Sequence, residues 1–462
     1  MTSSGHWWPW AALVASVVFL AAGQFWLAPH YGWWNDEVYS LWASDPTGPA
    51  QRLTGDSNPP LYYFLLRLAR IIASDPRVAM LLVNGGALLA SCGFVLATAR
   101  ARARPERAAL VCAWFIASGV TMFFFQESRA FFLGACLGLV AAWMATLHLE
   151  GTQPKRWALI LAATGTAAAF THFYAGLLTG CLGAALVAYG LAAGRRELVA
   201  PGLVLGIAST LAFALWFGVA SQPLTRISWI RFTFAEVRDA LWVVRSLTVG
   251  PAWMLLPIGA VFALGAMQKS LRPHLIVFAV ASALFVVLPL LISLKTPIIV
   301  GRYWCVGLAL LAIPIALVVD VLRANHRALQ RAGVALAALC AMSAAGFGLA
   351  TTHRFLIDEP VWSFADLVGV SARNCGPHSV SVPGFEHLYA TASGLPVSTF
   401  VAPARSPPQR SPGCRIVAWA EDVPADVDAI PDMLAFVGLP ATEENLQLER
   451  TRTGFVLFRE TR

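Results

Sequence analysis

The sequence predicts an α-helical polytopic membrane protein with about eleven transmembrane helices, interfacial helices in the first outer loop, and a small C-terminal α/β domain. Hydrophobic residues make up 58% of the 462 positions and charged residues only 13%, against roughly 25% charged residues in a soluble globular protein. Apolar runs of about 20 residues, the length that crosses a hydrocarbon core, recur through the first 350 positions. Many of the 17 tryptophans stand near the ends of these runs, where interfacial aromatic residues gather.

The apolar runs are divided into spans by length and charge. The first run, Pro9 to Leu27, lacks a basic region before it and a cleavage site after it, so we interpret it as a retained span. The run 59–74 is too short to cross a bilayer and carries Arg67 and Arg70 on one helical face, which favours a helix lying in the interface. The predicted spans are approximately 9–28, 78–99, 108–125, 131–148, 157–171, 175–193, 198–219, 248–267, 275–294, 304–322 and 332–350.

Short basic loops predict the orientation. Five of them fall on one side of the eleven spans, which we assign to the cytoplasm. The N-terminus is then inside and the tail outside, in a protein of the bacterial inner membrane, since the Ala- and Arg-rich composition is associated with GC-rich bacterial genomes. Because the basic residues lie in short loops, the net charge of +8 does not suggest a nucleic-acid partner. The five loops are 100–107, 150–157, 194–197, 269–274 and 323–331.

The tail differs from the rest of the chain. We place a transmembrane domain at 1–350 and an extracytoplasmic α/β domain at 351–462, a length sufficient for a small domain. Its alternating runs SVSVPG, RIVAWAED and GFVLFRE are typical of strands, and WSFADLVGVSARN has the period of an amphipathic helix. Cys375 and Cys414 could form a disulfide if the tail faces an oxidising compartment, but sequence does not supply the geometry.

Ionisable residues gather at the outer turns of this topology, although charges at membrane depth are costly and usually line a cavity or pathway. Cations there could hold the phosphate of an anionic lipid headgroup, and a carboxylate could take the proton from an attacking hydroxyl. A phosphate leaving group needs no general acid, because the same cations stabilise its charge. We expect Asp36 to be the base, with Glu37 or Asp56 orienting it or the acceptor. The other outer-turn candidates are Glu127, Arg129, His172, Lys295, Arg302 and Tyr303.

The order of these motifs resembles a known family. An outer-loop Asp-Glu pair, an acid before PPLYY, then QESRAFF, THFYAG and GRYW occur in this order within about residues 9–350. This pattern is similar to the C-type glycosyltransferase superfamily, in the branch of the protein O-mannosyltransferases and the lipid A aminoarabinose transferase. The resemblance implies that a sugar moves from a polyprenyl-phosphate donor to an acceptor on the outer face, with inversion. It also implies that Asp36 is the catalytic base, with Asp56 in the same site, and that Lys295 and Arg302 lie near the lipid phosphate. Arg129 matches the Arg of the family's Q-E-x-R pattern.

Two departures from the family pattern are visible. The Q-E-x-R motif commonly continues with a Tyr, where this chain has Phe131 or Phe132. The aminoarabinose transferase pattern has Glu-Lys before PPL, where this chain has GDSNPP, which argues against that substrate. The acceptor stays open between a glycan, a lipid and a protein.

Other interpretations of the same residues stay open. The first-loop acids could only solvate a helix or a turn, Glu127 and Arg129 could be a structural ion pair, and the late-loop cations could be interfacial residues. Carboxylates with His172 could hold a divalent cation, but no fixed ligand spacing supports a metal site, and no cofactor is assigned. The competing classes of protein are a lipid or solute transporter and an envelope scaffold.

Overall fold

The computed structural model describes residues 7–27, 35–54, 58–102, 104–219 and 232–325, Gly346, and the backbone of five short strands between positions 379 and 460. At a few positions within these ranges only the backbone is described. The chain divides into two compact units, one formed by residues 1–26 and 49–352 and the other by residues 27–48 and 353–462.

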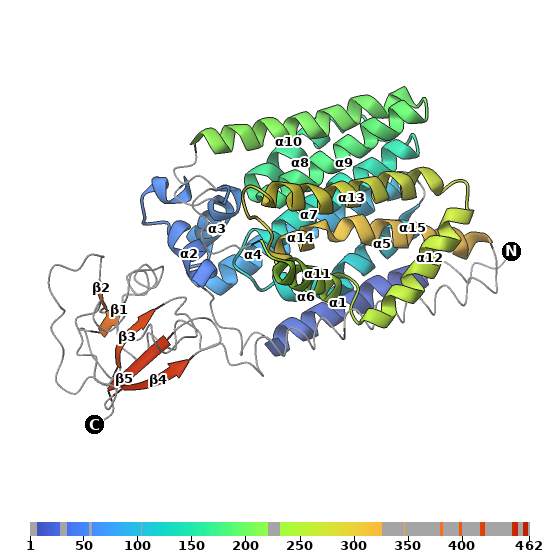
Figure 1. The fold of residues 1–462 in the computed structure, drawn as a ribbon. Helices are drawn as coiled ribbons and strands as arrows, with labels where there is room; N and C mark the ends of the chain where they lie inside the picture. The colour runs from blue at the N-terminus through green and yellow to red at the C-terminus, as the bar shows by residue number, and fades with distance from the viewer. Residues whose placement is uncertain are drawn as a thin grey trace. The chain divides into compact units, whose positions relative to one another are not determined.

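The first unit is built of helices (Figure 1). Residues with known preferences for helix N-termini mark where some of them begin. Asp75, for example, accepts hydrogen bonds from the backbone of Arg77 (2.7 Å) and Val78 (3.2 Å), and Pro76 occupies the first position of the helix that follows. The helices are α1 (Trp8–Leu27), α3 (Leu61–Ile72), α4 (Pro76–Arg100), α5 (Pro105–Ala117), α6 (Gly119–Phe124), α7 (Phe131–Leu149), α8 (Trp157–Thr171), α9 (Phe173–Ala192), α10 (Val199–Val219), α11 (Phe234–Thr248), α12 (Leu255–Met267), α13 (Arg272–Ser293), α14 (Gly301–Trp304) and α15 (Ala309–Asn325).

Four short 3-10 segments join these helices. They are η2 (Ala50–Thr54), η3 (Arg196–Leu198), η5 (Ala252–Met254) and η6 (Cys305–Leu308).

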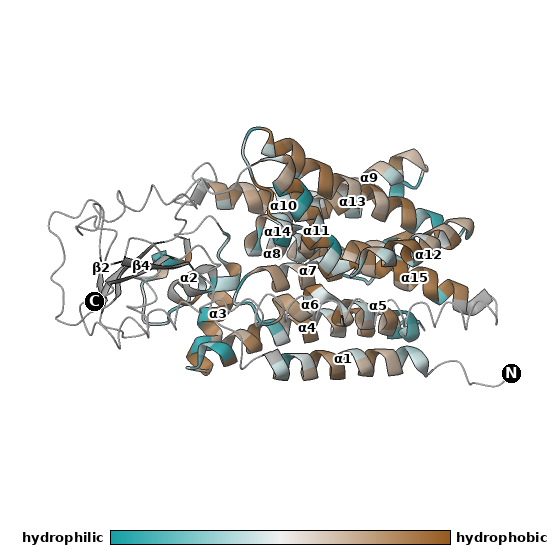
Figure 2. Ribbon diagram, turned by 60° about the horizontal axis from the view of Figure 1, so that its bottom comes forward, coloured by the Kyte–Doolittle hydropathy of each residue, from teal (hydrophilic) through white to brown (hydrophobic). Residues whose placement is uncertain are grey.

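Within the described part of the chain, seven helices are long and apolar enough to cross a membrane, or eight if the bent pair α11 and α12 is one span. Figure 2 shows hydrophobic residues along the lengths of these helices. The chain is therefore a polytopic helical membrane protein. The predicted span 332–350 lies, apart from Gly346, outside the described residues.

Two of the predicted spans are not single straight helices. The span predicted at 108–125 is broken at Ser118, whose hydroxyl accepts from the Thr121 backbone N–H (3.1 Å) and so starts α6. The span predicted at 248–267 is also wrong in its form. Its residues after Met254 form the 13-residue α12, which is bent by 70° from α11, and Gly250 between the two has a φ of 92°.

Helix α3 confirms the short amphipathic helix predicted at 59–74. Tyr62, Tyr63 and Leu66 are buried, whereas Ile71 and Ile72 are 68% and 82% exposed. Its 12 residues extend only about 18 Å, too little to cross a bilayer. Its location in a membrane interface stays a prediction.

An ionic cluster lies at the C-terminal end of α7. Glu150, directly after α7, accepts hydrogen bonds from Arg104 (2.9 Å) and Arg107, and Arg107 Nε also donates to Asp320 of α15 (2.8 Å). The side chains of Arg107 and Glu150 are 10% and 13% exposed. The cluster ties α5, α7 and α15 together at the end of α7 opposite Phe131.

We expect Glu150→Ala to lower the free energy of unfolding by about 3 kcal/mol, because it leaves the buried guanidinium of Arg107 with one carboxylate fewer. Thermal unfolding of the purified protein in lipid nanodiscs measures the loss. The control is Glu197→Ala, which removes an exposed ion pair with Arg195 and should change stability little. Equal losses in the two variants would contradict this role for Glu150.

The second unit contains α2 (Asn35–Ala43) and five strands, β1 (Ser379–Ser381), β2 (Val397–Thr399), β3 (Ile416–Ala420), β4 (Leu446–Arg450) and β5 (Val456–Glu460). β1 pairs with β2 in parallel, and β5 lies between β3 and β4 with antiparallel pairing. Strands are thus present in all three runs expected to form them, while β2 and β4 were not anticipated. The helix predicted at 362–374, and Cys375 and Cys414, lie outside the described residues, so the α/β character of the tail stays a prediction.

Candidate functional site

The tight turn 126–129 between α6 and α7 is fixed by side chains of two other helices. Asn84 of α4 donates through Nδ2 to the carbonyl oxygens of Phe125 (2.9 Å) and Glu127 (3.1 Å). The Tyr62 hydroxyl of α3 donates to the Glu127 carbonyl at 3.4 Å. The PPLYY and QESR motifs, 65 residues apart in the chain, therefore lie against each other.

Arg129 ends this turn and is held by two aromatic side chains. Its Nη1 donates to the Tyr63 hydroxyl at 3.3 Å, and its Cζ lies 5.9 Å from the ring centroid of Phe131. Only 6% of Arg129 is exposed. The family pattern commonly has a tyrosine where this chain has Phe131 or Phe132. In this chain the hydroxyl that accepts from Arg129 belongs to Tyr63 of α3.

Phe131, at the start of α7, is the centre of a cluster formed by segments far apart in sequence. Its ring centroid lies 5.0 Å from that of His172 and 5.4 Å from that of Tyr303. The Cζ of Arg302 on α14 lies 5.6 Å from the Phe131 centroid and 5.9 Å from that of Tyr303. We call Arg129, Phe131, His172, Arg302 and Tyr303 the arginine cluster.

The segment before α14 is fixed by hydrogen bonds from its neighbours. The Tyr174 hydroxyl of α9 donates to the carbonyl oxygen of Ile298 (3.0 Å), and the Ile298 N–H donates to Ser293 Oγ (3.1 Å). The Tyr174 ring also contacts that of Tyr303, with centroids 5.4 Å apart. These bonds position the GRYW motif, and with it Arg302, beside α7 and α9.

The arginine cluster is buried and cationic. Arg129 and His172 are nearly inaccessible, and Arg302 is half-buried. The arginine cluster contains two guanidinium groups, and the carboxylate of Glu127, which is 2% exposed, stands two residues before Arg129 in the same turn. His172 lies in the turn between α8 and α9. Its pKa is lowered well below its usual value, first by burial and then by the charges of Arg129 and Arg302. The site is therefore suited to bind an anion.

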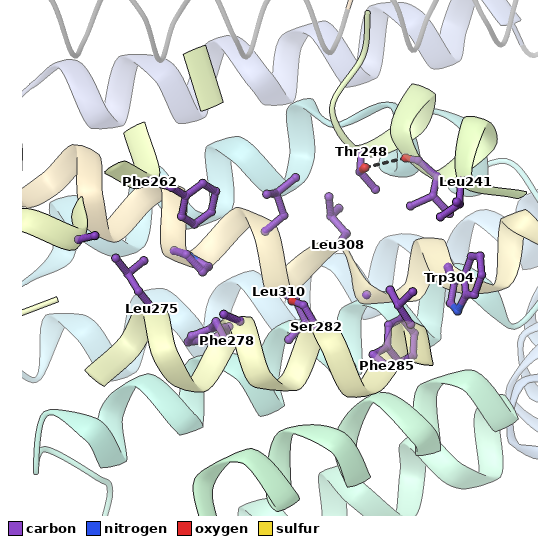
Figure 3. A pocket seen from close by; sticks show the side chains of 17 residues that line it. Leu241, Thr248, Phe262, Leu275, Phe278, Ser282, Phe285, Trp304, Leu308 and Leu310 are labelled. Atoms are coloured by element: carbon purple, nitrogen blue, oxygen red, sulfur yellow. Dashed lines mark hydrogen bonds between the residues drawn. The ribbon is translucent and has the colours of Figure 1, made fainter. Parts of the chain in front are cut away.

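An apolar cavity of about 490 Å³ lies beside this cluster. It is lined by α11, α12, α13, α15 and the segment Trp304–Leu308, and nearly all of its lining side chains are hydrocarbon or aromatic. Figure 3 shows Trp304 and Phe285 at one end and Phe262 and Leu275 at the other. Phe285 contacts Tyr174, with centroids 5.9 Å apart, and Trp304 follows Tyr303 in the chain. One end of the cavity therefore adjoins the arginine cluster.

The first-loop acids belong to the second unit or lie outside the described residues. Asp36 and Glu37 are the second and third residues of α2, so both stand in its first turn. Glu37 is completely buried, which does not fit simple solvation by water, whereas the side chain of Asp36 is not described. Asp56 lies outside the described residues. The roles of all three acids stay predictions.

Lys295 is exposed in the turn after α13, and the described structure contains no contact between its ammonium group and the arginine cluster. Among the described residues, no group of three or more His, Cys, Asp or Glu side chains is placed to hold a metal ion. The divalent cation considered for the adjacent first-loop carboxylates and His172 stays a prediction, since the side chain of Asp36 is not described.

Four contributors to the site were not anticipated from sequence. Tyr63 and Asn84 stand in helices where neither residue was singled out as a polar contact, and Phe131 was noted only as the absence of a tyrosine. Trp304 was grouped with interfacial anchors, although it is 3% exposed and lines the cavity. The doubled tyrosine of PPLYY, beside an outer-turn arginine motif, is a signal that could have revealed Tyr63.

No protein-family profile and no curated protein sequence matches this chain. Among solved structures it is similar to ArnT from Cupriavidus metallidurans in the apo state, with a TM-score of 0.60 and 15% identity over 97% of this chain and 98% of that one. The same protein bound to undecaprenyl phosphate gives a TM-score of 0.59 and 15% identity over 99% and 98%. The apo oligosaccharyltransferase of Archaeoglobus fulgidus gives 0.50 and 14% over 86% of this chain and 65% of that one.

At these identities the similarity shows the fold. The chain has the polytopic fold of these solved membrane proteins. The resemblance to the C-type glycosyltransferases that the ordered motifs predicted is therefore confirmed at the level of the fold.

Proposed function

We propose that this protein is a membrane glycosyltransferase that moves a sugar from a polyprenyl-phosphate donor to a hydroxyl acceptor on the extracytoplasmic face of a bacterial plasma membrane. The observation that carries the proposal is a pair of arginines, the buried Arg129 and the half-buried Arg302, next to one end of a 490 Å³ apolar cavity. An anionic headgroup joined to a hydrocarbon chain matches both parts of the site. The similarity in fold to a protein solved with undecaprenyl phosphate supports the same ligand class.

The two parts of the site contribute differently to donor binding. A polyprenyl chain already dissolved in the bilayer gains little hydrophobic free energy when it moves into an apolar cavity, because lipid tails are equally apolar. Affinity then comes chiefly from charge-assisted hydrogen bonds between the phosphate and the guanidinium groups, which can be bidentate. The cavity contributes by its shape, selecting a chain that can follow α13 and α15 away from the cluster.

The proposed reaction needs one base and a stabilised leaving group. Asp36 accepts the proton of the acceptor hydroxyl while that oxygen forms a bond to the anomeric carbon. The bond between the anomeric carbon and the phosphate oxygen breaks, and its electron pair leaves with the polyprenyl phosphate. Arg129 and Arg302 stabilise that charge, with inversion at the anomeric carbon. Glu37 or Asp56 orients the base or the acceptor, which is a glycan, a lipid or a protein.

The test uses the full-length protein in lipid nanodiscs with a panel of polyprenyl-phosphate sugars. We expect at least one donor to release polyprenyl phosphate by transfer or slow hydrolysis. We also expect polyprenyl phosphate, but not the uncharged polyprenol, to raise the unfolding temperature. No turnover with any donor, together with equal effects of the charged and uncharged lipids, would contradict the proposal.

A transporter is the second candidate, and one observation favours it. The 70° bend between α11 and α12 is a discontinuity of the kind found at transporter binding sites. A transporter would bind the phosphate lipid and move it between leaflets without breaking the bond to the sugar. Donor turnover in the same nanodiscs therefore separates the two candidates.

A further inference from the structure

The two ring nitrogens of His172 have different surroundings. Nδ1 accepts a hydrogen bond from the backbone N–H of Tyr174 at 3.2 Å, so that His172 acts as the N-cap of α9. A nitrogen that accepts a hydrogen bond carries the lone pair. In the neutral ring the proton is therefore on Nε2.

That Nε2 is buried and lacks a hydrogen-bond partner in the described part of the chain. His172 is 1% exposed, and its Nε2 has no hydrogen-bond partner among the groups that the structure describes. Buried polar atoms are nearly always satisfied, and an exception points to a water or a ligand that completes the site. His172, a member of the arginine cluster, thus has one N–H donor that no described protein group uses.

The surroundings keep this ring neutral. Burial opposes a charged imidazolium, and Arg129 and Arg302 repel it, so the pKa of His172 is lowered. The rings of Tyr174 and Tyr303 also pack near the His172 ring. The aromatic neighbours are Phe131, Phe173, Tyr174 and Tyr303, with centroids 5.0, 4.6, 6.1 and 5.0 Å from that of His172.

We propose that His172 binds the phosphate of the lipid donor as a neutral hydrogen-bond donor, through Nε2–H, alongside Arg129 and Arg302. The inference rests on the proposed function, because it assigns a role at the same anion site. It also excludes His172 as the general base, because Nδ1 is hydrogen-bonded to the backbone and Nε2 is already protonated. A single directional donor beside two cations favours an anion that presents separate oxygens, as a phosphodiester does.

His172→Asn is the decisive variant, because asparagine keeps an N-cap acceptor for α9 while its short amide does not reach the position of Nε2. We expect it to bind a polyprenyl methyl phosphodiester about 10- to 100-fold more weakly than the wild type, the usual loss for a hydrogen bond to a charged group. His172→Phe keeps the ring and removes both nitrogens, and should show the same loss. Wild-type affinity in either folded variant would overturn the inference.

Two further readouts separate a binding role from a structural one. The diester probe does not titrate near neutrality, so the ratio of wild-type to His172→Asn affinity should stay constant between about pH 6 and pH 8. If His172 became charged in this range, wild-type affinity for the anion would instead rise as the pH falls. Selective ¹⁵N-histidine labelling should show, in the signal that His172→Asn removes, a proton on Nε2 and none on Nδ1. The opposite tautomer would refute the inference.

The outcomes distinguish this inference from the proposed function. If Arg302→Gln loses diester binding and His172→Asn does not, the anion site is supported and the proposed role of His172 is contradicted. If the wild type binds the diester no better than polyprenol, the anion site itself fails and the inference fails with it.

Discussion

An Asp36→Asn variant is expected to lose sugar transfer by about 100- to 10,000-fold, the usual contribution of a positioned general base. The amide is close in shape to the carboxylate but does not accept the proton of the acceptor hydroxyl. Donor binding should be unchanged if, as proposed, the phosphate is held by the arginine cluster. Single-turnover release of polyprenyl phosphate measures the chemical step, and the shift in unfolding temperature with polyprenyl phosphate measures binding.

The control for this prediction is Asp239→Asn, a matched change at an exposed position of α11. The Asp239 carboxylate forms an ion pair with the neighbouring Arg238. This variant should leave both quantities unchanged. Normal transfer by Asp36→Asn would remove Asp36 from the chemistry. A parallel loss of binding and transfer would instead mean that Asp36 holds the donor.

An Arg302→Gln variant is expected to bind polyprenyl phosphate about 100-fold more weakly and to lose transfer by at least as much. Glutamine keeps hydrogen-bonding capacity but removes the charge and the paired N–H groups that fit a phosphate. It also removes the cation placed over the rings of Phe131 and Tyr303. Titration of nanodisc-embedded protein with polyprenyl phosphate gives the affinity.

Arg196→Gln is the matched control, because Arg196 is exposed in η3, in the turn between α9 and α10. Its affinity for polyprenyl phosphate should equal that of the wild type. If both variants weakened binding equally, the effect would be a general attraction of anionic lipid to a basic protein. If neither did, the phosphate would bind away from the GRYW motif.

Much of the helical unit could be predicted from sequence, because each long apolar run must satisfy its own backbone within the bilayer. The runs that became α4, α7, α9, α13 and α15 illustrate this. The breaks were harder to predict. Ser118 and Gly250 interrupt apolar runs but lower their mean hydropathy only slightly, and their effect depends on a local hydrogen bond and on a positive φ.

The site was predictable in composition but not in its contacts. Buried charge is so costly in an apolar setting that Arg129, His172 and Arg302 stood out from sequence. Their common neighbour Phe131 did not, because one phenylalanine among several carries no polar signal. The cavity could not be predicted either, since it is made mainly of ordinary hydrophobic residues from α11, α12, α13, α15 and the segment Trp304–Leu308, and its shape depends on how they pack.

The central claim is that one bound molecule connects the arginine cluster, the apolar cavity and Asp36. The most direct test is a cryo-EM structure of the full-length protein in nanodiscs with a non-transferable phosphonate analogue of a polyprenyl-phosphate sugar. The claim predicts anionic oxygens about 2.7–3.2 Å from the Arg302 guanidinium and from His172 Nε2. It further predicts the hydrocarbon chain between α13 and α15, and the Asp36 carboxylate facing the anomeric carbon. A headgroup bound elsewhere, or a sugar out of reach of Asp36, would contradict it.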